Sequence, residues 1–182
     1  MKRLLLFSCL LALLVFGQTQ SHAADKPNVL FIAIDDLNDW IGALGKRTDV
    51  KTPNLDKLAA RGVLFTRAYC AAPACNPSRA ALMTGKRPAT SGVYHNDQPW
   101  RPVMKDNVTL AQHFMQNGYR VEGGGKIFHN SYNDLASWQK WFKNPGFPEP
   151  KKRSLEGTGH FDWGMVDATN EEMGDTKVVD WG

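Results

Sequence analysis

The sequence predicts an α/β fold in which helices flank a mainly parallel sheet. Continuous apolar runs of strand length alternate with segments that carry helix start and stop signals, as is typical of parallel sheets. The chain has 182 residues, 42% apolar and 22% charged, as expected of one folded domain. The predicted strands are few for this architecture, and we expect no regular element at Asp180-Trp181-Gly182. The sequence therefore predicts part of a larger domain, truncated at its C-terminal side.

The N-terminal residues 1–23 have the layout of a secretory signal peptide. A basic pair precedes an apolar run, residues 4–16, that is short for a membrane span. Ser21 and Ala23 then place small residues at a cleavage site. We expect a signal peptide over 1–23 and an exported domain over 24–182, periplasmic or secreted from a bacterial host, with no membrane span after cleavage. An uncleaved N-terminal anchor is the alternative.

The charge balance argues against a nucleic-acid partner. The formal net charge of +4 falls to +2 when residues 1–23, which carry Lys2 and Arg3 and no acid, are removed. An exported domain this close to neutral carries no charge excess that argues for a nucleic-acid partner. The densest basic cluster, Lys151-Lys152-Arg153, is either a solvated loop or a contact for an anionic glycan.

Three apolar segments are the expected strands. Residues 29–34 form a continuous apolar run, which is typical of a strand buried on both faces of a sheet, and they end at Asp35-Asp36. Residues 63–69 and 119–122 are the second and third candidates. Beyond Asn130, prolines and scattered tryptophans indicate a long excursion instead of a regular core.

Helix signals separate these strands. Thr52-Pro53 is typical of an N-cap followed by proline at the first helical position, and it predicts a helix over 54–61 that Gly62 ends. A second helix is expected over 80–84, after a loop that carries the sequence from Cys75 to Arg79. Thr109 and Gln112 form a capping box for a third helix, which Gly118 closes.

Two features of these loops suggest chemistry. The adjacent carboxylates Asp35 and Asp36 suit a hard cation such as calcium or magnesium, although a plain turn at the end of a strand also explains them. Once Cys9 leaves with the signal peptide, Cys70 and Cys75 remain. Either these two pair in a disulfide, which their spacing cannot establish, or one of them has a chemical role.

The segment Cys75-Asn76-Pro77-Ser78-Arg79, followed by Leu82-Met83-Thr84-Gly85-Lys86-Arg87-Pro88, resembles the signature of the type I, formylglycine-dependent sulfatases of the alkaline phosphatase superfamily. Residues 27–36 and 52–56 look like the opening of that family. The resemblance implies a partial alkaline-phosphatase-like sandwich. It also implies that a formylglycine-generating enzyme oxidises Cys75 before folding, and that one Ca²⁺, with Mg²⁺ less expected, binds Asp35, Asp36 and residue 75.

The chemistry of sulfate ester hydrolysis fits these residues. The hydrated aldehyde at residue 75 would supply one hydroxyl to attack sulfur and a second whose deprotonation ejects the sulfate. Arg79 has a rigid donor fork that suits holding the diol and the anion, and the start of the following helix adds partial positive charge. The alternative for Cys75 is an ordinary buried thiol.

Lys126 and His129 match a G-K-x-F-H element of the same family, in which the lysine contacts the substrate sulfate and the histidine lies close by. A nucleotide-binding loop is excluded, because Ile127 replaces the needed Ser or Thr and Arg120 stands where glycine is required. A structural role for His129 stays open beside the catalytic one.

Residues 93–101, with the G-K-I-F-H element, are similar to the iduronate-2-sulfatase branch of the family and its bacterial members. Trp100 and Arg101 would then stack on a sugar and grip a carboxylate, or they form a packed tryptophan beside a surface arginine. His95 departs from the acidic residue expected there.

The predicted function is removal of sulfate from a sulfated glycan, such as a glycosaminoglycan, or from another small sulfate ester. The alternatives are a phosphodiesterase or phosphonate hydrolase of the same superfamily and an inactive chain that only binds glycans.

Overall fold

The computed structural model describes residues 26–149 and 166–182. The chain divides into two compact units, Met1–Ile32 and Ala33–Gly182. The expected signal peptide over 1–23 and the basic cluster over 151–153 lie outside the described residues. In the first unit, the described residues 26–32 contain no helix or strand.

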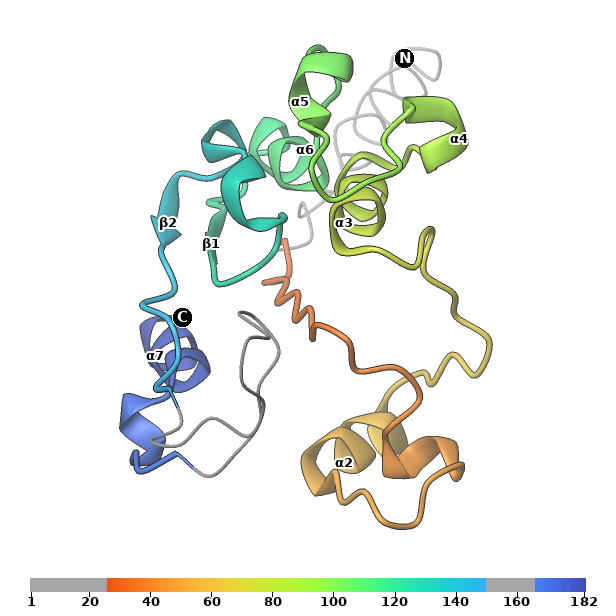
Figure 1. Cartoon of the computed structure of the whole chain (residues 1–182), viewed down its shortest axis with the longest axis vertical. Coiled ribbons are helices and arrows are strands. Elements are labelled where there is room, and N and C mark those ends of the chain that lie inside the picture. Colours follow the sequence, from red (N-terminus) through yellow and green to blue (C-terminus); the bar gives the residue numbers. More distant parts are fainter. Residues whose placement is uncertain (1–25, 150–165) are drawn as a thin grey trace, which may run out of the picture. The chain divides into compact units, whose positions relative to one another are not determined.

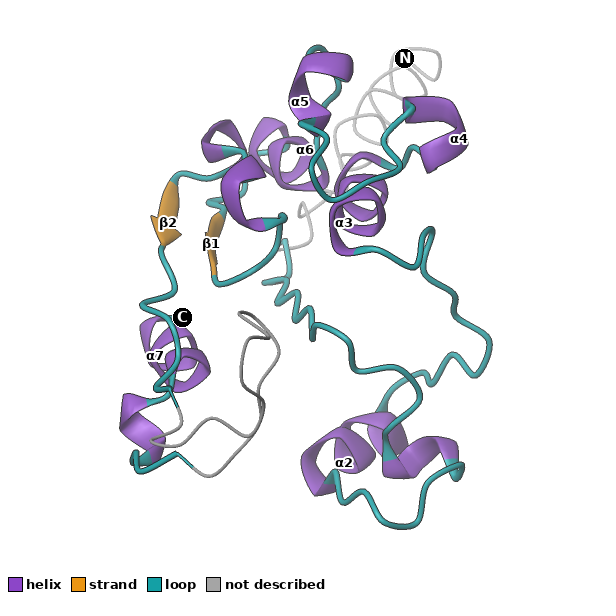
Figure 2. Ribbon diagram, viewed as in Figure 1, coloured by secondary structure: helices purple, strands orange, loops and turns teal. Residues whose placement is uncertain are grey.

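The second unit contains short helices and a small parallel sheet (Figures 1 and 2). Its described helices and strands are α2 (Pro53–Arg61), α3 (Cys75–Thr84), α4 (Pro88–Ser91), α5 (Trp100–Val103), α6 (Leu110–Gln116), β1 (Glu122–Gly124), β2 (Lys140–Phe142) and α7 (Gly174–Trp181). Short 3₁₀ turns are found at Gly42–Leu44, Asn130–Tyr132, Leu135–Ser137 and Asn170–Glu172. None of the helices within the described ranges is both long and apolar enough to cross a bilayer.

Helices α2 and α6 confirm their sequence signals. Helix α2 follows Thr52, has Pro53 in its first turn and ends at Gly62. At the start of α6, Thr109 Oγ1 accepts a hydrogen bond from the Gln112 amide, while the Thr109 amide donates to Gln112 Oε1. This reciprocal box satisfies two amides that the first helical turn leaves without partners.

Helix α3 begins at Cys75, five residues before the expected start at Ala80, so that part of the expectation was wrong. Proline is tolerated within a first helical turn because its missing N–H has no intrahelical acceptor there. Pro77 therefore does not prevent the helix from including the whole motif. Gly85 ends α3 at φ 70°, and its amide donates to the Ala81 carbonyl.

The sheet is parallel, as predicted, but its strands differ from those expected. β1 pairs with β2 in the register Glu122↔Lys140 and Gly124↔Phe142, so the third expected strand starts later than predicted. Neither 29–34 nor 63–69 is a strand. Most of their large apolar side chains are exposed, and the described residues provide no strand that pairs with them. Without a partner, an extended segment leaves its backbone donors and acceptors unpaired and is not a strand.

A compact apolar core lies among α3, α5, α6 and the segment after β1. Its members are all buried: Ala80, Met83, Val93, Trp100, Met104, Ala111 and Phe128. Trp100 and Phe128 stack at its centre, with ring centroids 5.0 Å apart and planes 7° apart. Helix α3 carries Cys75 and the segment after β1 carries Lys126, so the Trp100–Phe128 stack lies in a core to which both elements contribute.

The region beyond Asn130 is more regular than predicted. Strand β2 completes the sheet, and Trp138 packs against Gly123 so closely that a Cβ at this glycine would lie 2.7 Å from the indole ring. Helix α7 occupies Gly174–Trp181, where no terminal element was expected. The pairing of β2 with β1 accounts for the strand at Lys140–Phe142, because contacts with residues distant in the sequence order a segment whose local pattern is weak.

Candidate active site

Two carboxylates and a thiol from distant parts of the sequence converge in the second unit. One ligand atom from each of Asp35, Asp36 and Cys75 lies within 4.8 Å of the other two. Asp36 adopts the left-handed conformation with φ 51°, which few residues other than glycine, asparagine and aspartate occupy. The turn after residue 34 thus directs both neighbouring carboxylates toward the first turn of α3.

Asp35 bonds to two cationic side chains. Arg79 Nη2 donates to Asp35 Oδ1 at 2.6 Å, and Lys126 Nζ donates to Asp35 Oδ2. Burial by itself raises the pKa of Asp35, but the hydrogen bonds from Lys126 and Arg79, together with their charges, outweigh it and hold that pKa below 3.8. Asp35 is therefore ionised at neutral pH and available as an oxygen ligand.

Arg79 connects α3 to the loop after β1. Its side chain is 9% exposed, and Nη1 donates to the backbone carbonyls of Lys126 and Ile127 while Nη2 reaches Asp35. A guanidinium has a fixed planar fork of donors, so these bonds orient its plane. Arg79 therefore lies beside Asp35, one of the predicted metal ligands.

Lys126 and His129 lie beside the same cluster. Lys126 Nζ is 3.8 Å from Cys75 Sγ. Burial and the positive charges of Lys126 and Arg79 lower the pKa of His129 below 6.5, while Asp35 opposes them. Among the described residues, His129 Nδ1 is buried and has no hydrogen-bond partner. The lowered pKa keeps the imidazole neutral at neutral pH.

The structure does not bring Trp100 and Arg101 to this cluster. Trp100 is 1% exposed and packs against Phe128, so its ring is not available to stack on a sugar. Arg101 forms an ion pair with Asp134 and donates to the Asn107 carbonyl. The expectation that Trp100 stacks on a sugar is therefore corrected in favour of the packing alternative, whereas substrate contact by Arg101, whose side chain is 28% exposed, stays a prediction.

Asn76 is a site residue that the sequence did not reveal. It is 1% exposed, and its side-chain Nδ2 donates to the carbonyls of His95 and Gln98. Its backbone amide donates to Asn96 Oδ1. Asn76 therefore connects the first turn of α3, beside Cys75, to the loop that carries His95. The motif treats this position as variable, so only a buried side chain in the structure could identify it.

Neither of the two cysteines within the described ranges forms a disulfide. Cys70 is an exposed free thiol and Cys75 a half-buried one, which excludes the disulfide alternative in this structure. The Cys75 thiol is free to be modified and lies at the first position of α3.

The donor set fits a hard divalent cation only in part. Two carboxylates supply the oxygen ligands that Ca²⁺ or Mg²⁺ prefers, but a thiol is a soft ligand. An oxygen at residue 75, as in a hydrated formylglycine, would make the three groups consistent with a hard cation. Three groups are still short of the six to eight oxygens typical of calcium.

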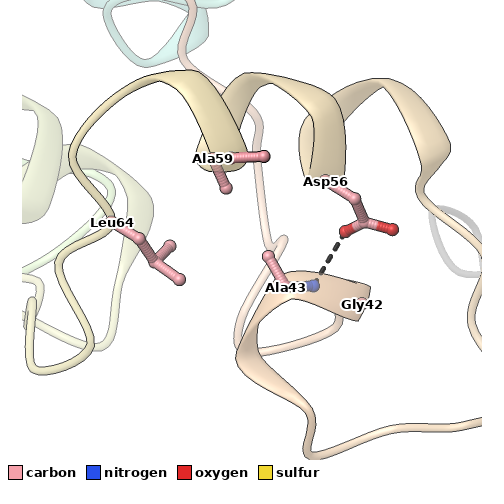
Figure 3. A pocket seen from close by; sticks show the side chains of 6 residues that line it. Gly42, Ala43, Asp56, Ala59 and Leu64 are labelled. Carbon is pink, nitrogen blue, oxygen red and sulfur yellow. Dashed lines mark hydrogen bonds between the residues drawn. The ribbon is translucent and has the colours of Figure 1, made fainter.

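The described residues also line a pocket elsewhere, between the 3₁₀ turn Gly42–Leu44 and α2 (Figure 3). It contains none of the candidate site residues. In it, Asp56 Oδ1 accepts a hydrogen bond from the Ala43 amide at 2.7 Å, and Thr52 Oγ1 accepts one from the Gly42 amide. These two side chains cap the turn, which is a structural role for the segment that resembles the family opening.

The second unit thus combines an α/β fold with one cluster that holds two carboxylates, a thiol and two cationic side chains. The family model described as Sulfatase matches residues 27–178. The chain belongs to the sulfatase family.

Individual relatives agree with this assignment. A protein named Sulfatase from Formosa agariphila is 40% identical over 199 aligned residues, which cover 98% of this chain and 39% of that protein. Iduronate 2-sulfatase of Homo sapiens is 35% identical over 75% of this chain and 25% of its own length. N-acetylgalactosamine-6-sulfatase of Homo sapiens is 32% identical over 86% of this chain and 33% of its own length. The chain thus spans between a quarter and two fifths of the relatives named here.

Proposed function

We propose that the full-length protein is a sulfuric ester hydrolase that removes sulfate from a sulfated glycan, with residue 75 as its nucleophile. The observation that carries this proposal is the convergence of Cys75 with Asp35 and Asp36, within 4.8 Å, beside Lys126 and Arg79. Membership in the sulfatase family supports the reaction class, because every residue of this cluster falls within the matched range 27–178.

Each side chain has a distinct role in this proposal. Lys126, 3.8 Å from Cys75 Sγ, neutralises an oxygen of the sulfate held at residue 75. Arg79 holds the carbonyls of Lys126 and Ile127 and so keeps that lysine directed at the cluster. Neutral His129 can give or take a proton at Nδ1, which no described residue binds.

Residue 75 requires modification for this role. A formylglycine made from Cys75 by a formylglycine-generating enzyme, acting before folding, would supply a hydrated aldehyde with an oxygen nucleophile. Cys75 is only half-buried in the free thiol state and stands at the first position of α3, where the positive end of the helix favours a developing negative charge.

A divalent cation, with Ca²⁺ favoured over Mg²⁺, would bind Asp35, Asp36 and residue 75. When bound, it would supply positive charge to neutralise the transferring sulfate group. The ionised state of Asp35, which Lys126 and Arg79 maintain, prepares this carboxylate for the cation.

The substrate class follows from the relatives. The names Iduronate 2-sulfatase and N-acetylgalactosamine-6-sulfatase describe sulfated sugars, and we infer a sulfated glycan here, with an iduronate-2-sulfatase-like preference. Such substrates lie outside the cytoplasm, in agreement with the predicted signal peptide over 1–23 and with export to the periplasm or medium.

The test uses the full-length protein, co-expressed with a formylglycine-generating enzyme and loaded with calcium. Turnover of an aryl sulfate and release of sulfate from a glycosaminoglycan are the expected results, while an aryl phosphodiester should react poorly. Mass spectrometry of the peptide that contains residue 75 distinguishes cysteine from formylglycine. Cys75→Ala should abolish turnover and leave the circular dichroism spectrum unchanged. Full activity of this variant, or faster cleavage of the phosphodiester, would refute the proposal.

A further inference from the structure

Trp100 and Arg101, two neighbouring residues of α5, contact the segment after β1 at three places. Trp100 stacks on Phe128. The same indole donates from Nε1 to the Tyr132 carbonyl at 2.9 Å. Arg101 forms an ion pair with Asp134. One short helix therefore holds both the middle and the far end of the segment 126–134.

The Trp100 contacts are fully buried. Trp100 is 1% exposed and Phe128 3%, and their ring planes are within 7° of parallel. The single polar atom of the indole has a backbone partner, as buried tryptophans require. A substitution that keeps an aromatic ring would retain the stacking, whereas an aliphatic residue would remove both contacts.

Arg101 also contacts the Trp100 ring. Its guanidinium carbon lies 4.2 Å from the centroid of the Trp100 ring, in a cation–π contact. Arg101 Nε and Nη2 both donate to the Asp134 carboxylate, a bidentate arrangement that lysine cannot reproduce. Asp134 is itself fixed, because Ser137 Oγ donates to its Oδ2 at 2.5 Å.

The segment that this pair holds begins with candidate site residues. Lys126 and His129 flank Phe128, and the Lys126 and Ile127 carbonyls accept the hydrogen bonds of Arg79. The Tyr132 amide donates to the His129 carbonyl at 2.8 Å, so the bond from Trp100 to Tyr132 also restrains the histidine. Displacement of Phe128 would therefore move Lys126 relative to Cys75 and Asp35.

We propose that Trp100 and Arg101 are positioning residues, which hold Lys126 and His129 in register with residue 75 without touching the substrate. This inference rests on the proposed sulfatase function. It adds that Trp100 and Arg101 restrain the segment 126–134, and we call this restraint the clamp. Misplacement of a catalytic group by about 1 Å can lower a rate about 100-fold, so a clamp of this kind has a measurable effect on catalysis.

The experiment compares Trp100→Leu, Trp100→Phe and Arg101→Lys in the full-length, calcium-loaded protein. For Trp100→Leu we expect kcat per folded molecule to fall about 10- to 100-fold and the inhibition constant of inorganic sulfate to rise. Trp100→Phe keeps the ring stack and should stay within about 3-fold of wild type. Arg101→Lys, which replaces a partly exposed side chain and should fold, is expected to lower kcat about 5-fold.

Val93→Ala is the matched control, because Val93 is 1% exposed in the same core and has no contact with the segment 126–134 among those described above. It should lower the melting temperature and leave kcat per folded molecule unchanged. The inference is overturned if Trp100→Leu also behaves like Val93→Ala, or if Trp100→Phe loses as much activity as Trp100→Leu. If Trp100→Leu fails to fold, wild-type kcat in Arg101→Lys overturns it.

Hydrogen exchange separates this inference from the proposed function. Amides of the segment 126–134 should exchange faster in Trp100→Leu and Arg101→Lys than in wild type, and at the wild-type rate in Val93→Ala, whether or not the protein hydrolyses a sulfate ester. If the wild type shows no turnover but these exchange differences are present, the proposed function is refuted and the clamp remains as a structural feature. Unchanged exchange in both variants would refute the clamp alone.

Discussion

Arg79 Nη2 donates a hydrogen bond to Asp35 Oδ1 at 2.6 Å across 44 residues of sequence. The second oxygen of the same carboxylate accepts a hydrogen bond from Lys126, which lies 91 residues away from Asp35. A single carboxylate thus joins the first turn after residue 34, helix α3 and the loop after β1. A cation that binds Asp35 competes with Arg79 and Lys126 for the same oxygens, so metal binding and the position of these two side chains are linked.

We predict that Arg79→Lys destabilises the protein and inactivates it. Lysine keeps the charge but loses the fork that reaches two carbonyls and a carboxylate, and buried acceptors left without donors cost about 2 kcal/mol. Thermal unfolding and aryl sulfate turnover measure both effects. Arg47→Lys, at an exposed ion pair with Asp49, is the matched control and should change neither. Wild-type stability of Arg79→Lys would contradict this account of the guanidinium.

Asn76→Ala tests the loop connection beside Cys75. Loss of the Asn76 amide leaves the carbonyls of His95 and Gln98 without their donor, and we expect the free energy of unfolding to fall by about 2 kcal/mol. Urea denaturation of the full-length protein gives this value. Asn54→Ala, at an exposed position of α2, is the control and should change the free energy of unfolding little. An equal decrease in the two variants would show that the buried hydrogen bonds of Asn76 do not stabilise the fold.

The pKa of His129 predicts a pH dependence of stability. Burial and the charges of Lys126 and Arg79 lower this pKa below 6.5 in the folded protein. The unfolded chain therefore binds the proton first as the pH falls below 6.5, so the free energy of unfolding decreases with decreasing pH until the folded-state pKa is passed. Denaturation between pH 7 and 5 measures the slope. His129→Gln should reduce it, and an unchanged slope would show that another group is responsible.

Removal of calcium should abolish turnover and lower the melting temperature of the full-length protein. Without a cation, the adjacent carboxylates Asp35 and Asp36 repel each other, and within the described ranges Asp35 alone of the two forms ion pairs. Dialysis against a chelator, followed by addition of Ca²⁺ or Mg²⁺, tests the requirement and the preference. Asp36→Asn should weaken the calcium response in a titration, and full activity in the chelated protein would exclude a metal requirement.

Features encoded within a few residues were predictable from the sequence. The capping box of Thr109 and Gln112 and the termination of α2 at Gly62 appear where their signals predicted. The candidate ligands Asp35, Asp36 and Cys75 do lie together. Each of these depends on local backbone preference or on a motif whose spacing requires its members to meet.

Other features depended on contacts that no local pattern specifies. Residues 29–34 have the composition of a buried strand, but pairing requires a partner that the described chain does not place beside them. In a sequence, a tryptophan such as Trp100 can be a sugar-stacking residue or a core residue. Only its burial against Phe128 distinguishes these two roles.

The sequence by itself determined the family and the parallel α/β class, because these reside in motif residues and short-range signals. Only the tertiary structure decided that Asn76 is a buried connector, that α3 begins at Cys75, and that Trp100 and Arg101 contact Tyr132 and Asp134. The physical reason is that burial and hydrogen-bond partners are properties of residues distant in sequence, and they arise only when the chain has packed.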